Sequence, residues 1–213
     1  MRGYQFLVKL QHVQPEVWRR IVLPEELDFY DLHSVIQRAM GWKDVHLFSF
    51  FLENEDTNTT IRLDRDEDSV EEHQAMAAHF KKNVPEKDTY AYSRYEDFIR
   101  TNVLLAREVP LSEYVSTIPT FGYTYDFGDG WDHTVQLEAI VEDFNKDFPL
   151  VMEGEGDCPP EDVGGPPGYA HFLQVLANPQ DDEHDTMKAW ATSQGFKSFS
   201  VKDANDALEE EWC

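Results

Sequence analysis

The segment from residue 121 to residue 142 restricts the fold of this chain more than any other stretch. Phe121 to Phe127 and His133 to Glu142 each have the residue pattern of a β-strand, and Gly128-Asp129-Gly130 lies between them. An Asp-Gly pair favours a tight turn, because glycine accepts the positive φ angle that such turns need. The segment therefore predicts an antiparallel hairpin, in which His133 and every second residue after it face one side.

A second hairpin is expected at the start of the chain. From Tyr4 to Leu10 every second residue is apolar, which places one apolar face on a strand. After a bend at Pro15, Val17 to Leu23 has the pattern of the partner strand, and Pro24 ends it.

Helices are expected around these hairpins. Asp31 to Met40 has one apolar stripe at helical spacing, with Asp28 or Asp31 as the candidate N-cap and Gly41 where a left-handed residue ends many helices. Further strands are expected at His46–Leu52 and 61–63, and further helices at 69–82, 93–107, 169–177, 183–192 and 203–211. This order predicts an α+β fold: an antiparallel sheet built from β-hairpins with helices packed against it.

The 213 residues fit a single domain, 1–213, with a helical insertion at about 64–110. An acidic run begins at Asp64, and capping-box patterns at Ser69–Glu72 and Ser93–Glu96 indicate two helices inside the insertion. The insertion contains no recognisable site chemistry of its own.

Charge and composition exclude several kinds of partner. The chain has 42 acidic and 18 basic residues and a net charge of −24, so direct binding to nucleic acid or anionic lipid is not expected. No segment approaches the roughly 18 apolar residues of a membrane span, and the start of the chain lacks the apolar region of a signal peptide. Cys158 and Cys213 do not form a disulfide framework. We expect a cytoplasmic, reduced protein that does not bind membranes.

Two stretches concentrate the residue types that form functional sites. The first runs from Tyr123 to His133 and the second from Cys158 to Tyr169, and together they hold aromatics, carboxylates, glycines, a histidine and a cysteine. A core does not require such residues side by side, so we expect a pocket or groove here. The candidate binding residues are Trp18, Arg19, Arg20, His33, Trp42, His46, Tyr125, Asp126, Asp129, Trp131, His133, Cys158, Glu161, Asp162 and Tyr169.

The aromatic residues favour a non-catalytic binding or accessory module with a protein or peptide partner. Rigid aromatics beside a Pro/Gly-rich loop are typical of peptide-recognition surfaces, although the same residues also fill small α+β cores. Trp131 follows the tight turn and is the aromatic residue most expected to be exposed.

A metal-dependent hydrolase is the alternative. His33, His46 and His133, with nearby carboxylates, offer the ligands that zinc, manganese or iron accept, and a metal ion is the one cofactor considered. No two of these histidines have a spacing that places both on one element. His133 is also consistent with a core histidine bonded to Asp126 or to a backbone carbonyl.

Two other catalytic schemes have less support. Cys158 with His133 or His171 as base would be a thiol nucleophile, but the two prolines after it exclude a helix N-terminus, where a thiol pKa is most readily lowered. Acid–base hydrolysis by the carboxylates competes with a structural role, because turn aspartates usually bond their own backbone. Glu161-Asp162 is expected to tie its loop to Arg19 or Arg20.

The motifs, taken in order, resemble the plasmid pRiA-type ORF-three-like family, whose members are often labelled transposon-resolvase-like (TnpR family) proteins. The resemblance covers about residues 4–180 and rests on Pro15, Val17-Trp18-Arg19-Arg20, Asp31-Leu32-His33, Ile36, Met40-Gly41-Trp42, His46-Leu47-Phe48-Ser49-Phe50, Tyr125 to His133 and Cys158 to Tyr169. It implies a compact α+β domain in an uncharacterised, mobile-element-associated family. The long stretch between Asp64 and Pro110 departs from the family pattern.

Resolvase activity is not expected from this sequence. Serine recombinases need a nucleophilic serine among several arginines and a basic helix-turn-helix that holds DNA. This chain has 18 basic residues in all and no basic recognition helix.

Overall fold

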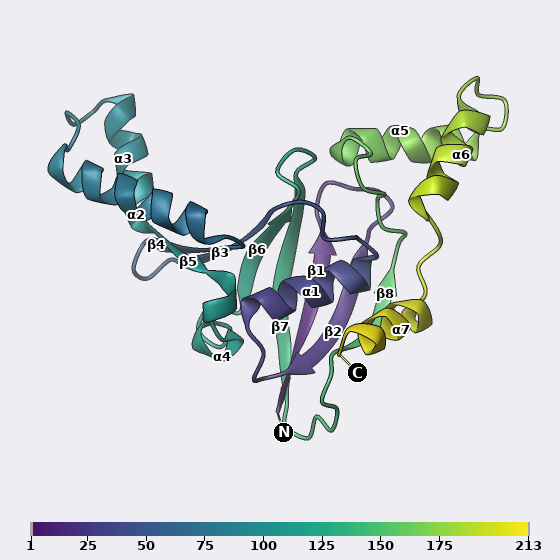
Figure 1. Ribbon diagram of the computed structural model, residues 1–213, viewed down its shortest axis with the longest axis horizontal. Helices are drawn as coiled ribbons and strands as arrows, with labels where there is room; N and C mark the ends of the chain where they lie inside the picture. The colour runs from purple at the N-terminus through teal and green to yellow at the C-terminus, as the bar shows by residue number, and fades with distance from the viewer. Residues whose placement is uncertain (1, 213) are drawn as a thin grey trace.

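The computed structural model describes residues 2–212, which form an eight-stranded sheet with helices against it (Figure 1). The strand order is β5-β4-β3-β6-β7-β1-β2-β8, and neighbouring strands are antiparallel except for the parallel pair β4 and β5. The strands are β1 (Gly3–Leu10), β2 (Trp18–Pro24), β3 (Phe48–Asn54), β4 (Thr59–Asp64), β5 (Thr101–Leu105), β6 (Thr120–Tyr125), β7 (Trp131–Val141) and β8 (Leu150–Glu155). The α+β class predicted from the sequence is confirmed.

Both predicted hairpins form, and their pairing separates an inner from an outer face. Phe6 of β1 lies opposite Ile21 of β2, and both are completely buried. On the outer face, Arg20 forms ion pairs with Glu138 of β7 and Glu153 of β8. Because side chains alternate along a strand, the same strands supply the core and a charged surface.

Helix α1 (Phe29–Met40) lies across the inner face of the sheet. Its start is fixed by a capping box in which the Asp28 side chain accepts from the backbone N–H of Asp31 and the Asp31 side chain accepts in return. Gly41 ends the helix at φ 101° in the left-handed region, as predicted. Helix α7 (Val201–Trp212) packs against α1 and β8.

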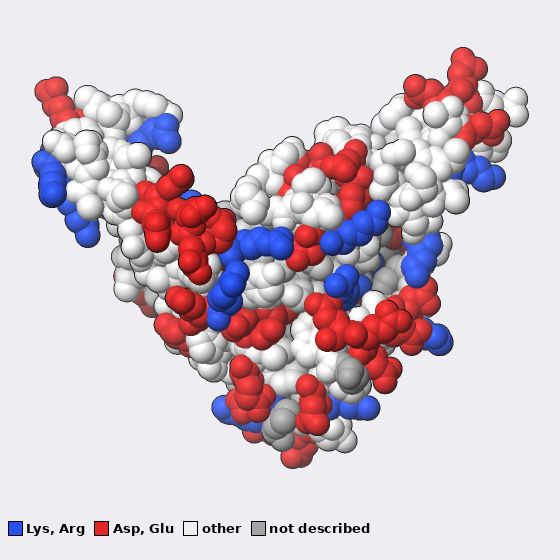
Figure 2. All heavy atoms as spheres, in the orientation of Figure 1, with Lys and Arg blue, Asp and Glu red and all other residues white. Residues whose placement is uncertain are grey.

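Two helical arms project from opposite ends of the sheet (Figure 1). One consists of α2 (Glu67–Lys82) and α3 (Tyr90–Arg100), and the other of α5 (Gly165–Ala177) and α6 (His184–Gln194). The 3-10 turn η1 (Ala106–Glu108) and α4 (Leu111–Tyr114) return the chain to β6. Figure 2 shows a hollow between the arms and acidic side chains over much of this face.

Several element boundaries differ from the sequence-based expectation. The helix expected to reach Arg107 ends at Arg100, because residues 101–105 form the edge strand β5, which pairs with β4 and buries Val103 and Leu105. Strand β8 was not expected at all. The N-caps of α2 and α3 are Asp66 and Thr89 rather than the expected serines three or four residues later.

Among residues 2–212, no helix combines the length and apolar character that crossing a bilayer requires. Cys213, the second cysteine of the sequence, lies outside the described residues. The single-domain assignment and the cytoplasmic location stay predictions.

We predict that Gly156→Ala destabilises the protein far more than Gly195→Ala. Both glycines have positive φ angles, 80° and 76°, but a Cβ at Gly156 would lie 2.1 Å from the carbonyl oxygen of Glu16. At Gly195, no atom of the described part of the chain, apart from the adjacent residues, would lie within 4 Å of an added Cβ. Backbone strain alone costs about 1 kcal/mol, and the added clash should bring the loss at Gly156 to roughly 2 to 5 kcal/mol. Urea denaturation of both variants measures the difference, and equal losses would contradict the prediction.

Candidate metal centre

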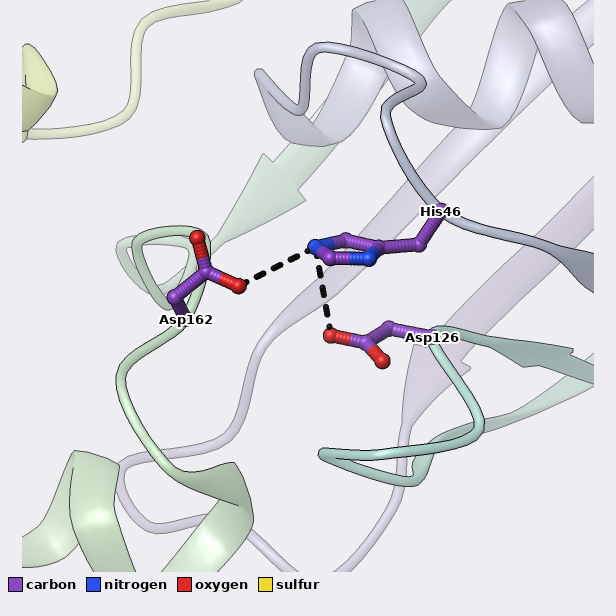
Figure 3. A group of neighbouring side chains, drawn as sticks. All are labelled: His46, Asp126 and Asp162. Carbon is purple, nitrogen blue, oxygen red and sulfur yellow. Dashed lines mark ion pairs between the residues drawn. The ribbon is translucent and has the colours of Figure 1, made fainter.

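Three loops meet at one end of the central strands β3 and β6 and bring a histidine and two aspartates together (Figure 3). His46 lies between α1 and β3, Asp126 begins the turn between β6 and β7, and Asp162 lies between β8 and α5. His46 Nε2 is 3.2 Å from Asp162 Oδ1 and 3.5 Å from Asp126 Oδ2. A third carboxylate approaches from Glu161, whose Oε2 is 3.9 Å from the same nitrogen. Sequence-predicted residues from three separate segments therefore converge on one point.

Asp126 divides its two carboxylate oxygens between the turn and the site. It adopts φ 53°, and its Oδ1 accepts from the backbone N–H groups of Gly128 at 2.9 Å and Asp129 at 3.3 Å. Aspartate tolerates this left-handed conformation because its short side chain bonds the local backbone. The turn thus fixes the carboxylate, and Oδ2 is left facing His46.

Glu161 likewise uses one carboxylate oxygen for hydrogen bonds and directs the other toward His46, and it is more buried. Its Oε1 accepts from the backbone N–H of Lys43 at 2.8 Å and from the Tyr125 hydroxyl at 3.1 Å. Its Oε2 is buried and has no hydrogen-bond partner within residues 2–212, and the side chain is only 6% exposed. Buried carboxylate oxygens are normally satisfied, so this oxygen indicates a missing partner, either a hydrogen-bond donor or a cation.

A buried polar network holds the loop that carries His46. The Tyr123 hydroxyl accepts from Gln37 Nε2 at 3.0 Å and lies 2.8 Å from His33 Nδ1. It therefore donates to His33 Nδ1, which leaves the Nε2–H of His33 to bond Asp44 Oδ1 at 3.0 Å. Burial lowers the pKa of His33, in agreement with a neutral ring. His33 is thus engaged on both nitrogens and does not join His46.

His133 is a core histidine, one of the two roles considered from the sequence. Its Nδ1 lies 3.2 Å from the carbonyl oxygen of Tyr123, which makes Nδ1 the donor. Burial lowers the pKa of His133 to about 4. His46 is therefore the one of the three candidate histidines that lies in the carboxylate cluster.

The aromatic residues of the two motifs are packed inside the protein. Trp42, Tyr125, Trp131 and Tyr169 are all at most 3% exposed, so the expectation of an exposed Trp131 is wrong. Trp131 lies on the inner face of β7 with His133 and Val135, since every second residue of a strand faces the same side. Trp42 Nε1 donates to the Pro159 carbonyl at 3.0 Å, and the Tyr169 hydroxyl donates to the Asp157 carbonyl at 2.7 Å. These residues anchor the loops that form the site.

Neither arginine binds the Glu161-Asp162 pair, contrary to the expectation from the sequence. Arg19 points inward and donates to four backbone carbonyls, and Arg20 points outward beside the half-buried Trp18. The loop is tied instead by Asp129, whose Oδ2 accepts from the backbone N–H of Gly164 at 3.0 Å.

Cys158 does not have the surroundings of a thiol nucleophile. Burial raises the pKa of its thiol, which disfavours the reactive thiolate. The two proposed bases bond elsewhere, His133 to the Tyr123 carbonyl and His171 to Glu183.

A family model described as plasmid pRiA4b ORF-3-like protein matches residues 2–206. The chain belongs to this family. It is 31% identical over 213 residues to the uncharacterized protein y4hQ of Sinorhizobium fredii, covering 97% of this chain and 92% of that protein. It is also similar to the crystal structure of MM3350, a protein of unknown function from Methanosarcina mazei Go1, with a TM-score of 0.73, 27% identity, and coverage of 95% of this chain and 97% of that one. The resemblance inferred from the motifs is confirmed. Family membership supports the fold and assigns no reaction, because both relatives are uncharacterised.

We predict that His133 makes the protein less stable in mild acid. The unfolded chain binds a proton near pH 6.5, while the folded protein resists protonation of His133 until about pH 4. The free energy of unfolding should therefore fall as the pH decreases from 6.5 to 4, by up to roughly 3 kcal/mol from this residue. Well above pH 6.5, His133 is neutral in both the folded and the unfolded protein, so it causes no further change in the free energy of unfolding.

The measurement is urea denaturation at several pH values for wild type, His133→Asn and the exposed control His171→Asn. The pH dependence should be shallower in His133→Asn and unchanged in His171→Asn. The same slope in all three proteins would show that His133 does not cause the loss.

Proposed function

We propose that the protein binds a divalent metal ion between His46, Asp126, Glu161 and Asp162 and uses it for hydrolysis. The observation that carries this proposal is the buried Oε2 of Glu161. It lacks a hydrogen-bond donor within the described chain and faces, together with two other carboxylate oxygens, a single histidine nitrogen.

The balance of charge supports a cation at this point. Two like charges about 4 Å apart repel by about 4 kcal/mol at an effective dielectric constant of about 20. Three carboxylates surround His46 Nε2, and the histidine alone, even when protonated, offsets one negative charge. A divalent ion would offset two and would also satisfy the unpaired oxygen of Glu161.

The donor set favours a first-row metal such as Mn²⁺. One imidazole nitrogen and several carboxylate oxygens suit manganese, iron or zinc. A metal with bonds of about 2.1 Å holds its ligand atoms about 3 to 4.2 Å apart. The ligand atoms of His46, Asp126 and Asp162 lie within 4.8 Å of one another, so small side-chain rotations would complete the site.

The exposure of the site supports hydrolytic chemistry. Asp162 is 71% exposed and the His46 side chain 29% exposed, so solvent reaches these two side chains although His46 Nε2 itself is buried. A metal ion with an open position lowers the pKa of bound water and polarises the bond that this water attacks. The binding of a protein or peptide partner stays a prediction without a supporting contact, because the aromatic residues on which it rested are buried.

We predict that wild-type protein binds one Mn²⁺ per chain and that Glu161→Gln and Asp126→Asn each weaken this binding by about tenfold or more. Both replacements keep the shape of the side chain and a hydrogen-bond acceptor, but they remove the negative charge. Isothermal titration calorimetry of metal-free protein with MnCl₂, ZnCl₂ and MgCl₂ gives the affinities.

Asp132→Asn is the matched control, since Asp132 lies in the same motif but is exposed and bonds Thr124. Its affinity should equal that of wild type. Absence of binding by wild type, or an unchanged affinity in Glu161→Gln, would overturn the proposal. Circular dichroism confirms that each variant is folded.

A further inference from the structure

A pocket of about 280 Å³ lies beside the metal centre and shares Glu161 with it. The end of α1, the loop from Cys158 to Glu161 and the segment 194–200 form its walls. Four basic residues line it: Arg19, Arg38, Lys43 and Lys197. In a chain with 42 acidic and only 18 basic residues, this is an unusual concentration of positive charge.

Two of the four basic groups are already neutralised at the rim of the pocket. Arg38 forms an ion pair with Glu211, and Lys197 Nζ lies 2.5 Å from Asp203 Oδ2. The remaining two, Arg19 and Lys43, have no carboxylate within 4.0 Å among residues 2–212.

Arg19 is a buried positive charge with an incomplete shell. Its side chain lies against the ring of Phe199, with Cζ 3.5 Å from the ring centroid, and the residue is 1% exposed. Four N–H···O bonds to backbone carbonyls use four of its five donors, and these carbonyls carry no net charge. Asp157 acts on Arg19 only from a distance, and a buried charge without a counter-charge in contact is costly, so an anion in the adjoining pocket would stabilise it.

Lys43 is the exposed counterpart of Arg19. Its Nζ lies 3.3 Å from the neutral amide oxygen of Gln194, while its backbone N–H bonds Glu161. The ammonium group is exposed and retains donors for a ligand.

We propose that this pocket binds a phosphate group of the substrate on which the metal centre acts. Two unpaired positive charges match a phosphate dianion, and arginine and lysine are the usual donors to its oxygens. That the phosphate belongs to a substrate rests on the proposed function, but the binding of phosphate to the pocket does not require the metal. Shared Glu161 brings the bound group next to the centre.

Isothermal titration calorimetry of metal-free protein with inorganic phosphate tests the proposal. Wild type should bind phosphate, and Lys43→Gln should weaken binding by about fivefold or more. Lys188→Gln, which removes an exposed lysine of α6 outside the pocket, is the matched control and should bind like wild type. Sodium acetate at the same ionic strength distinguishes phosphate from carboxylate recognition and should bind more weakly.

The outcomes separate this inference from the metal proposal. Lys43→Gln keeps the backbone N–H that bonds Glu161, so it should bind Mn²⁺ like wild type. No phosphate binding by wild type, an unchanged affinity in Lys43→Gln, or equal binding of acetate would each overturn the phosphate pocket. If any of these results were combined with normal Mn²⁺ binding, the phosphate pocket would be wrong and the metal centre would still be supported.

Discussion

The buried guanidinium group of Arg19 joins the parts of the fold from which the candidate site extends. It donates to the carbonyl of Ala39 in the last turn of α1, to a carbonyl of β2, and to two carbonyls where the chain leaves β8. An apolar residue would leave these carbonyls without this donor, and a buried unsatisfied carbonyl costs about 1 to 3 kcal/mol. The loops after α1 and β8, which carry His46 and Glu161, therefore begin at points that are fixed relative to each other.

The site uses the two oxygens of a carboxylate for different purposes. In Asp126 and Glu161 one oxygen accepts from backbone or tyrosine donors and the other faces His46. Because the fold orients these two groups, little conformational freedom remains to be lost when an ion binds. Asp162 is exposed and its carboxylate accepts no comparable bond from residues 2–212, so it is the ligand that would adjust its position.

Local patterns predicted most of the fold, whereas the partners within the site depended on tertiary structure. The hairpins and α1 follow from alternation, from the turn at Asp129-Gly130 and from the caps at Asp28 and Gly41. Strand β5 was missed because a five-residue edge strand whose partner, β4, is distant in the sequence has little local signal. The two motifs supply Asp126, Glu161 and Asp162, the carboxylates that cluster around His46. The choice of His46 over His133 needed the sheet, which turns His133 toward the core together with Trp131, two residues earlier on the same face of β7.

The net charge of −24 places opposite demands on the two proposed sites. It attracts cations and so favours a metal ion, but it repels an anionic ligand that comes within the screening distance of about 10 Å. Only a local excess of positive charge, as at Arg19 and Lys43, overcomes that repulsion. Glu161 lies between the sites, with one oxygen toward His46 and the other bonded to the backbone of Lys43. A metal ion would offset the charge of Glu161 and weaken its repulsion of a neighbouring phosphate, and by reciprocity the phosphate would strengthen metal binding.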